Sequence, residues 1–177
     1  MAISRGEVVS PQEVRHHGAG VLLLTRDNRA TIAVMDATVL RTREVWTAIS
    51  GSGVVLVGGE KPARPTKAFA TLAHPRSAVG VTKDGRYLIL VAIDGRQSGH
   101  SDGATLAEVA DWLTRFGAHD GLNLDGGGST ALVAESGGRA VALNRPSGAV
   151  RGSVARQERS NGNNFGLWAR PLAGTEN

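Results

Sequence analysis

Cysteine is absent from the chain and aromatic residues are few, which excludes several kinds of site. The 177 residues include 24 glycines, whereas Phe, Trp and Tyr together account for 4%. Without cysteine there is no disulfide scaffold, no thiol nucleophile and no cysteine-based zinc site. Abundant glycine with few aromatics favours many short strands joined by turns over a bundle of helices.

Long hydrophobic runs are also missing. The longest apolar run, Leu88 to Ile93, is far too short to span a bilayer as a helix. The first residues, Met1 to Glu7, contain no apolar segment of the signal-peptide kind, so we expect no signal peptide in this chain. A lack of cysteine is compatible with the cytoplasm, the periplasm or the exterior, so composition alone assigns no compartment.

Two common catalytic motifs are not present. Gly59-Glu60-Lys61 lacks the spacing of a phosphate-binding P-loop, and no helix is predicted to follow it. The polar segment 98–102 contains Ser, His and Asp, which invites a serine hydrolase interpretation. Because no Gly-x-Ser-x-Gly elbow joins a strand to a helix there, a polar loop is favoured instead.

Positive charge is moderate and dispersed. The formal net charge is +4, and the Lys and Arg residues are scattered rather than clustered. The few aromatic residues do not interleave with them, so we expect no nucleic-acid partner. The net charge by itself favours anionic substrates, nucleic acid or an anionic cell envelope, without choosing among them.

Length and composition indicate one domain with an α+β fold. A chain of 177 residues, 41% of them hydrophobic, can form one core but not two ordinary domains, so we expect a single domain over residues 1–177. We expect mixed, mainly antiparallel β-sheets with one main covering helix and glycine-rich site loops. Apolar patterns predict strands at 21–25, 30–35, 45–50, 54–57, 78–82, 86–93, 130–134, 139–143 and 165–169. The run 88–93 is apolar throughout, which predicts a central strand.

One segment, at about 105–116, has the pattern of a helix. Thr105 and Glu108 form a capping box, and Gly117 stands where a left-handed C-terminal cap belongs. The apolar positions recur with helical spacing and form one stripe, at Leu106, Val109, Ala110, Leu113 and Phe116. The stripe predicts a helix that covers the central strands.

The most informative stretch is 121–133, where two apolar runs flank one carboxylate, three glycines and two hydroxyls. Side chains alternate along a strand, so Leu122 and Leu124 share one face. Asn123 and Asp125 share the other face, side by side at the end of the strand. The glycines that follow allow close approach of the backbone or positive φ, and their N–H groups can form an anion-binding concavity.

Five short blocks follow one another along the chain. They are His74-Pro75-Arg76-Ser77, Asp94-Gly95-Arg96-Gln97, Ser101 to Leu106, Asn123 to Ser129, and Asn144-Arg145-Pro146. In this order the blocks resemble the phosphodiester glycosidase family, from about Ile3 to Trp168 and most specifically between His74 and Arg145. The resemblance implies a hydrolase that acts on sugar phosphodiesters, and an extracellular or cell-envelope location.

The resemblance and the side-chain chemistry together give a site hypothesis. Arginine pairs well with phosphate, and two carboxylates across a sugar ring are the usual equipment for glycoside hydrolysis. We hypothesise that Asp125 activates water or attacks the anomeric carbon, that Asp94 is the second carboxylate, and that Asn123 orients Asp125 or a sugar hydroxyl. The candidate substrate-binding residues are Arg76, Arg96, Asn123, Gly126, Gly127, Gly128, Ser129, Asn144, Arg145, Arg159 and Asn163.

The leaving group also affects this hypothesis. A phosphomonoester anion leaves far more readily than a sugar alkoxide, so strong general-acid help is less necessary than in an ordinary glycosidase. Arginine side chains and the N–H groups of the glycine loop could stabilise the charge that develops on the phosphate.

The chain departs from the family pattern at both ends. The family's closing segment, Glu-Arg-Pro-Val-x-Asn, corresponds to residues 158–163, where Ser160 and Asn161 differ from it. The family's N-terminal region, with an Asn-Gly-x-Phe block, has no counterpart here. We therefore expect a shortened chain, a minimal relative, or one that borrows strands from a partner. An unpaired sheet edge would favour association, and a homo-oligomer is one such partner.

Two other functions stay open from the sequence. A metal-dependent phosphodiesterase would use Asp94, Asp125 and a histidine to hold a divalent ion; otherwise no cofactor is expected. A non-catalytic module would bind a glycan or the cell envelope through a site that has lost part of its machinery.

Overall fold

The computed structural model describes residues 2–10, 20–34, 45–62, 68–148, 158–161 and 164–169. The strands are β1 (Ala2–Ser4), β2 (Glu7–Ser10), β3 (Gly20–Thr25), β4 (Ala30–Val34), β5 (Val45–Ser50), β6 (Gly53–Leu56), β7 (Arg76–Val81), β8 (Leu88–Ile93), β9 (Asp120–Gly126), β10 (Val133–Ser136) and β11 (Arg139–Ala142). The helical elements are α1 (Ala68–Thr71), α2 (Leu106–Arg115) and a 3₁₀ turn, η1 (Gly127–Ser129).

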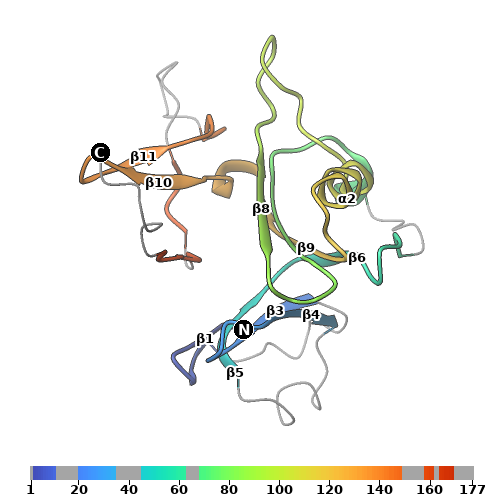
Figure 1. Ribbon diagram of the computed structural model, residues 1–177. Helices are drawn as coiled ribbons and strands as arrows, with labels where there is room; N and C mark the ends of the chain where they lie inside the picture. Colours follow the sequence, from blue (N-terminus) through green and yellow to red (C-terminus); the bar gives the residue numbers. More distant parts are fainter. Residues whose placement is uncertain are drawn as a thin grey trace.

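The strands form three sheets, which Figure 1 shows. A five-stranded sheet has the order β2-β1-β5-β3-β4, a four-stranded sheet has the order β6-β9-β7-β8, and β10 pairs with β11 in a separate hairpin. Every strand pairing in the described residues is antiparallel. The expectation of mainly antiparallel sheets with few helices is therefore confirmed.

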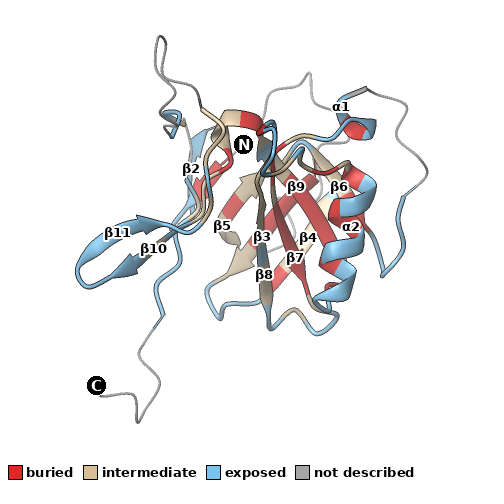
Figure 2. Cartoon of the chain, turned by 90° about the horizontal axis from the view of Figure 1, so that it is seen from above, coloured by how far each residue is buried: buried red, intermediate tan, exposed pale blue. Residues whose placement is uncertain are grey.

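Apolar side chains cover both faces of the four-stranded sheet. On one face lies the inter-sheet core, where the fully buried Leu22 of β3 meets Val79 of β7 and Leu122 of β9. On the opposite face, α2 packs its buried Val109 and Leu113 against the sheet. Figure 2 shows α2 with a buried inner side and an exposed outer side. This arrangement fixes β7 and β9, the two inner strands, from both sides.

The helix α2 begins as its sequence predicts. The Thr105 hydroxyl accepts the Glu108 backbone N–H at 3.2 Å, and the Glu108 carboxylate accepts the Thr105 N–H at 2.8 Å, which completes the capping box. At the other end, Gly117 takes a positive φ of 91°. The expected apolar stripe stops one residue early, because Phe116 lies beyond the last helical residue and is 57% exposed.

Two strand predictions are corrected by the structure. The run 88–93 forms β8, but β8 is an edge strand rather than a central one. Its two faces are each partly covered, since Ile89 and Val91 pack against the α2 side and Leu88 packs against the inter-sheet core, while Leu90 is exposed. A continuous apolar run therefore indicates that apolar groups lie over both faces of a strand. It does not indicate that both edges of the strand are paired with other strands. The segment 165–169 is not a strand, although Phe165 still packs into the inter-sheet core.

Among the helices of the described residues, none is long and apolar enough to cross a membrane.

Two strand glycines give a matched test of this packing. At Gly80 of β7, a Cβ atom would lie 2.6 Å from the Ala118 Cβ and 3.1 Å from Leu113, whereas a Cβ at Gly53 of β6 would meet nothing within 4 Å. We expect Gly80→Ala to lower the free energy of unfolding by about 1–3 kcal/mol through overpacking. Gly53→Ala should change it by less than about 1 kcal/mol.

Urea unfolding followed by circular dichroism measures both variants. Equal stability of Gly80→Ala and Gly53→Ala would show that α2 does not press closely on the four-stranded sheet.

Candidate functional site

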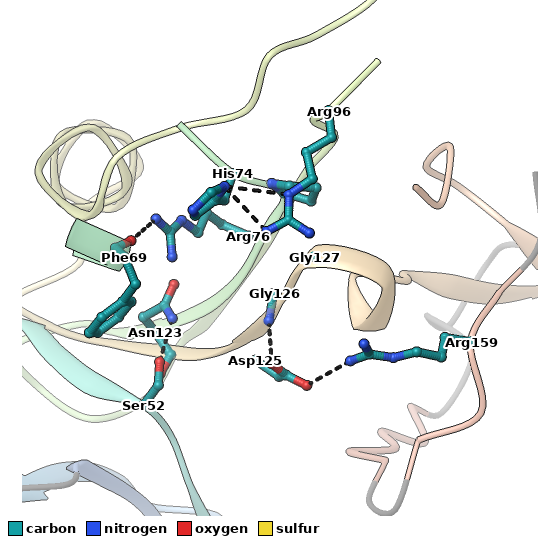
Figure 3. Close-up of a pocket in the computed structure, with 11 residues that line it drawn as sticks. Ser52, Phe69, His74, Arg76, Arg96, Asn123, Asp125, Gly126, Gly127 and Arg159 are labelled. Carbon is teal, nitrogen blue, oxygen red and sulfur yellow. Dashed lines mark hydrogen bonds and ion pairs between the residues drawn. The ribbon is translucent and has the colours of Figure 1, made fainter. Parts of the chain in front are cut away.

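A pocket of about 330 Å³ lies at one end of the four-stranded sheet, where β7 begins and β9 ends (Figure 3). The antiparallel register places Arg76 of β7 beside Gly126 of β9 and Ile93 of β8, so the segments around these residues meet at one edge. The residues that line the pocket are Ser52, Phe69, His74, Pro75, Arg76, Arg96, Asn123, Asp125, Gly126, Gly127 and Arg159.

The strand β9 supplies two polar side chains to this pocket. Asn123 and Asp125 both line it, while Leu122 and Leu124 lie in or against the inter-sheet core, as strand alternation predicts. The two side chains differ in burial: Asn123 is 2% exposed, and the Asp125 side chain is 75% exposed. The pocket therefore has a buried amide on one side and a solvated carboxylate on the other.

Asn123 is held by its amide nitrogen. Its Nδ2 donates to Ser52 Oγ at 2.7 Å and to the Leu124 carbonyl at 3.3 Å. Its Oδ1 is buried and has no hydrogen-bond partner among the described residues. Buried polar atoms are rarely left in this state, so this oxygen calls for an explanation.

Arg76 is a buried brace as well as a pocket residue. Its side chain is almost fully enclosed, and its Nε donates to the Ala104 carbonyl at 2.9 Å. Its Nη2 donates to the carbonyls of Leu72, at 3.0 Å, and of Phe69. Burial, followed by repulsion from Arg96, lowers the pKa of the Arg76 guanidinium. The Nε and Nη2 donors of Arg76 therefore hold α1 and the loop before α2 against β7.

Arg96 is exposed and is oriented by His74. Arg96 has a left-handed φ of 55°, and its Nε and Nη2 lie 3.4 and 3.3 Å from His74 Nδ1. Because a guanidinium Nε–H can only donate, Nδ1 must accept, which places the imidazole proton on Nε2. Partial burial, then the charges of Arg96 and Arg76, lower the pKa of His74, so the ring is neutral at pH 7.

The first two glycines after Asp125 allow close approach of the backbone, and their N–H groups already have partners. A Cβ atom at Gly126 would lie 2.6 Å from the Pro75 carbonyl oxygen, and one at Gly127, where φ is 62°, would lie 3.0 Å from Arg96 Nη1. The N–H of Gly126 donates to Asp125 Oδ1 at 2.7 Å, and that of Gly127 donates to the Pro75 carbonyl at 3.0 Å. These two N–H groups are therefore already engaged, contrary to the expected anion-binding loop.

Arg159 closes the pocket beside Asp125. Its Nη2 lies 3.5 Å from Asp125 Oδ2 and also donates to the Ser129 hydroxyl. A Cβ atom at Gly128 would lie 3.6 Å from the Arg159 side chain, which is an ordinary contact distance, so this position does not require glycine. Ser129 positions Arg159 through its hydroxyl, and neither Gly128 nor Ser129 lines the pocket. Asn163 lies outside the described residues.

Asp94 does not line the pocket, although it was expected to face Asp125 across a sugar. Its Oδ1 accepts Nδ2 of Asn144 at 3.0 Å and the Arg145 N–H at 2.9 Å, while its Oδ2 lies 2.9 Å from His100 Nε2. The strand β7 separates β8 from β9, so the backbones that carry the two acids lie about 10 Å apart.

The polar cluster around Asp94 instead attaches the segment after β11 to the sheet. Asn144 Oδ1 accepts the Leu132 N–H at 2.8 Å, and the buried Gln97 donates to the Arg145 carbonyl at 2.8 Å. Asn144 and Arg145 therefore lie outside the pocket that they were predicted to line. Burial disfavours the charged form of Asp94, but hydrogen bonds from His100, Asn144 and the Arg145 backbone outweigh it and lower its pKa.

Several lining residues were not predicted as site residues. His74 and Pro75 adjoin Arg76 in a block that the sequence did single out. No sequence pattern marks Ser52 or Phe69 as a site residue. Packing alone places them at the pocket, Ser52 from the β5–β6 turn and Phe69 from α1.

A metal site is also not apparent in the described part of the chain. No three His, Asp or Glu side chains there are placed to share a metal ion. The metal-dependent alternative therefore has no ligand set among these residues.

The buried Arg76 and the exposed Arg96 should differ in their contributions to stability. Lysine has one nitrogen and cannot reach the three carbonyls that Arg76 binds, so Arg76→Lys should lower the free energy of unfolding by about 3 kcal/mol. Arg96→Lys changes an exposed side chain and should shift it by less than about 0.5 kcal/mol. Urea titrations measure the free energy of unfolding of both variants. If Arg96→Lys were destabilised and Arg76→Lys were as stable as the wild-type protein, the roles assigned to the two arginines would be wrong.

Asp94 should contribute stability in a pH-dependent way. At pH 7, Asp94→Asn should lower the free energy of unfolding by about 1–3 kcal/mol, because the Asn144 and Arg145 donors lose a charged acceptor. A lowered pKa means that this contribution is present above the ordinary value of 3.8 and is lost as pH falls through the folded-state value.

Urea unfolding of the two proteins, at pH 7 and at pH values below 3.8, measures the difference. The exposed Asp111→Asn variant is the control. A difference that stays constant with pH would contradict the assigned role of Asp94.

Comparisons with known proteins agree with this architecture. A sequence model for phosphodiester glycosidases matches residues 1–168. The zebrafish N-acetylglucosamine-1-phosphodiester alpha-N-acetylglucosaminidase catalytic domain, auto-inhibited by pro-peptide, is similar in structure, with a TM-score of 0.73 and 24% identity. The likeness covers 90% of this chain and 54% of that one, so this chain spans about half the length of that relative and shares its fold.

Two other solved structures show weaker likeness. A hypothetical protein from Synechocystis has a TM-score of 0.46 and 25% identity, over 76% of this chain and 23% of that chain. A putative exported protein from Burkholderia pseudomallei K96243 has a TM-score of 0.46 and 19% identity, over 77% and 38%. The search of curated proteins found no match. Because the family match extends over residues 1–168, this chain belongs to the phosphodiester glycosidase family.

Proposed function

We propose that this protein hydrolyses the glycosidic bond of a sugar-1-phosphodiester and releases the free sugar and a phosphomonoester. The observation that carries the proposal is the pocket itself, in which one carboxylate, Asp125, lies among three guanidinium groups. A diester with one anionic phosphate and a neutral sugar suits such a mixture of charges. The family supports the same reaction class.

Arg96 and Arg159 are the proposed phosphate ligands. Both guanidinium groups line the pocket, and neither is buried. The Nε2–H of His74 would add a neutral donor beside Arg96. Arg76 adds positive potential from the pocket wall, while its own hydrogen bonds go mainly to backbone carbonyls. These donors would stabilise the charge that the phosphate gains as the bond breaks.

Asp125 is the proposed catalytic carboxylate. Either it accepts a proton from water while the water oxygen bonds to the anomeric carbon, or it attacks that carbon directly. In both cases the anomeric C–O bond breaks and its electron pair stays on the phosphate oxygen. After direct attack, a water molecule then adds to the anomeric carbon, the bond from that carbon to Asp125 breaks, and the water proton passes to the phosphomonoester or to solvent, which frees the sugar and restores the carboxylate. A phosphomonoester is a good leaving group, so one carboxylate is sufficient. We assign Asp94 to positioning the segment after β11 rather than to this step.

A second candidate function is binding without turnover. One observation favours it: the chain departs from the family's closing segment at Ser160 and Asn161, next to Arg159. An extracellular or cell-envelope setting, where sugar phosphodiesters are exposed to such a protein, is likewise proposed from the family.

The proposed reaction is tested by incubating the protein with a panel of sugar-1-phosphodiesters in ¹⁸O-labelled water. We expect the label in the sugar, which reports C–O cleavage. Asp125→Asn should reduce kcat by about 10²–10⁴-fold, because the variant has neither base nor nucleophile at that position. Asp111→Asn, on the exposed side of α2, should leave kcat unchanged.

Each alternative gives a different product pattern. Label in the phosphate would report P–O cleavage and contradict the glycosidase proposal. Saturable binding without product would support the binding module. Full turnover by a folded Asp125→Asn variant would remove the role of Asp125.

A further inference from the structure

We propose that Asn123 selects the substrate by accepting a hydrogen bond from a neutral donor on the sugar, either a hydroxyl or an amide N–H. The inference rests on the proposed function and adds a specificity determinant to it. Its basis is that Asn123 lines the pocket while its Oδ1 atom is buried and has no partner among the described residues.

The orientation of the Asn123 amide follows from its neighbours. The Leu124 carbonyl can only accept, so the group 3.3 Å from it must be the NH₂ end. Ser52 Oγ donates its proton to the backbone carbonyl of Asn123 at 3.4 Å. The lone pairs of the same hydroxyl are then left to accept the side-chain Nδ2 of Asn123 at 2.7 Å. Both contacts therefore assign the same end of the amide as the donor. The remaining atom, Oδ1, is an acceptor.

The backbone around Asn123 keeps this amide in place. A Cβ atom at Gly51 would lie 2.3 Å from the backbone carbonyl oxygen of Asn123, so the turn before β6 packs directly on β9. The Ser52 N–H donates to the same carbonyl at 2.8 Å. With the strand fixed and Nδ2 anchored, Oδ1 keeps one direction. Figure 3 shows it turned away from Ser52, toward the side of the pocket where Arg76 and His74 lie.

A buried acceptor without a donor can discriminate between ligands, because leaving it unpaired costs free energy. A bound ligand that excludes water and offers Oδ1 no donor leaves this acceptor unpaired, at a cost of about 1–3 kcal/mol. A substrate that supplies the donor removes this cost, whereas an analogue without the donor leaves it in place. Sites that hydrogen-bond a substrate hydroxyl or N–H discriminate strongly for this reason.

The charges in the pocket restrict which part of the substrate meets Asn123. Its Oδ1 carries partial negative charge and would repel a phosphate oxygen, which the arginine side chains attract instead. Asn123 and Asp125 are two residues apart on one strand face, a separation of about 7 Å that a single sugar ring can bridge. The sugar would therefore span from Asp125 to Asn123, with the phosphate toward Arg96.

The test uses the sugar-1-phosphodiester that the wild-type protein hydrolyses best. Analogues of it, each lacking one hydroxyl or amide N–H of the sugar, are compared by kcat/KM in wild-type protein and in Asn123→Ala. In the wild-type protein, we expect kcat/KM for one analogue to be about 10- to 100-fold lower than for the parent diester. In Asn123→Ala the same deletion should change kcat/KM by less than about 2-fold, as expected when the two groups contact each other.

Two variants keep the comparison interpretable. Arg96→Lys should lower kcat/KM for all analogues by a similar factor, because it acts on the phosphate. Asn123→Leu, of similar size to Asn, replaces Asn123→Ala if the alanine variant does not fold by circular dichroism.

The outcomes separate this inference from the proposed function. If the parent diester is hydrolysed but no deletion is selectively rescued in the Asn123 variants, the inference is wrong and the proposed function stands. If no diester is hydrolysed, the reaction is wrong, and the same comparison by Kd in calorimetry decides the inference. Absence of binding to every diester would overturn both.

Discussion

The structure depends on the burial of one guanidinium group at the first residue of β7. Arg76 lies between β8 and β9 in the sheet, and its side chain binds carbonyl groups of α1 and of the loop before α2. An arginine stays charged when buried, so its donors must be satisfied, and backbone carbonyls from two segments satisfy them here. The same contacts bring Phe69 to the pocket wall. A group that resembles a substrate ligand in sequence thus also assembles the site.

Around this brace the pocket divides into two chemical parts. Arg96, Arg159 and the His74 Nε2–H form a part rich in donors, which suits an anion. Asn123 and Ser52 form a neutral part with a free acceptor, and Asp125 lies within reach of both. For the sugar-1-phosphodiester proposed above, this division would favour one direction, with the phosphate at the arginines and the sugar toward β9. Charge and hydrogen bonding, rather than shape alone, would then decide which bond is presented to the carboxylate.

Features that depend on neighbouring residues were predictable from the sequence, and features that depend on distant contacts were not. The capping box of α2 and the shared face of Asn123 and Asp125 follow from local geometry, and both are observed. Two partners of Asp94, Asn144 and Arg145, lie about 50 residues away in sequence, and no local pattern shows that they occupy its carboxylate. Ser52 meets Asn123 across 71 positions, a contact set by the pairing of β6 with β9.

The central claim is that one pocket binds the phosphate and the anomeric carbon of the same molecule. A crystal structure of the Asp125→Asn variant with a bound sugar-1-phosphodiester measures this most directly. The account predicts phosphate oxygens within hydrogen-bond distance of Arg96 or Arg159, and the anomeric carbon next to residue 125. A diester bound at the Asp94–Asn144 cluster, or one with its phosphate turned toward Asn123, would contradict the account.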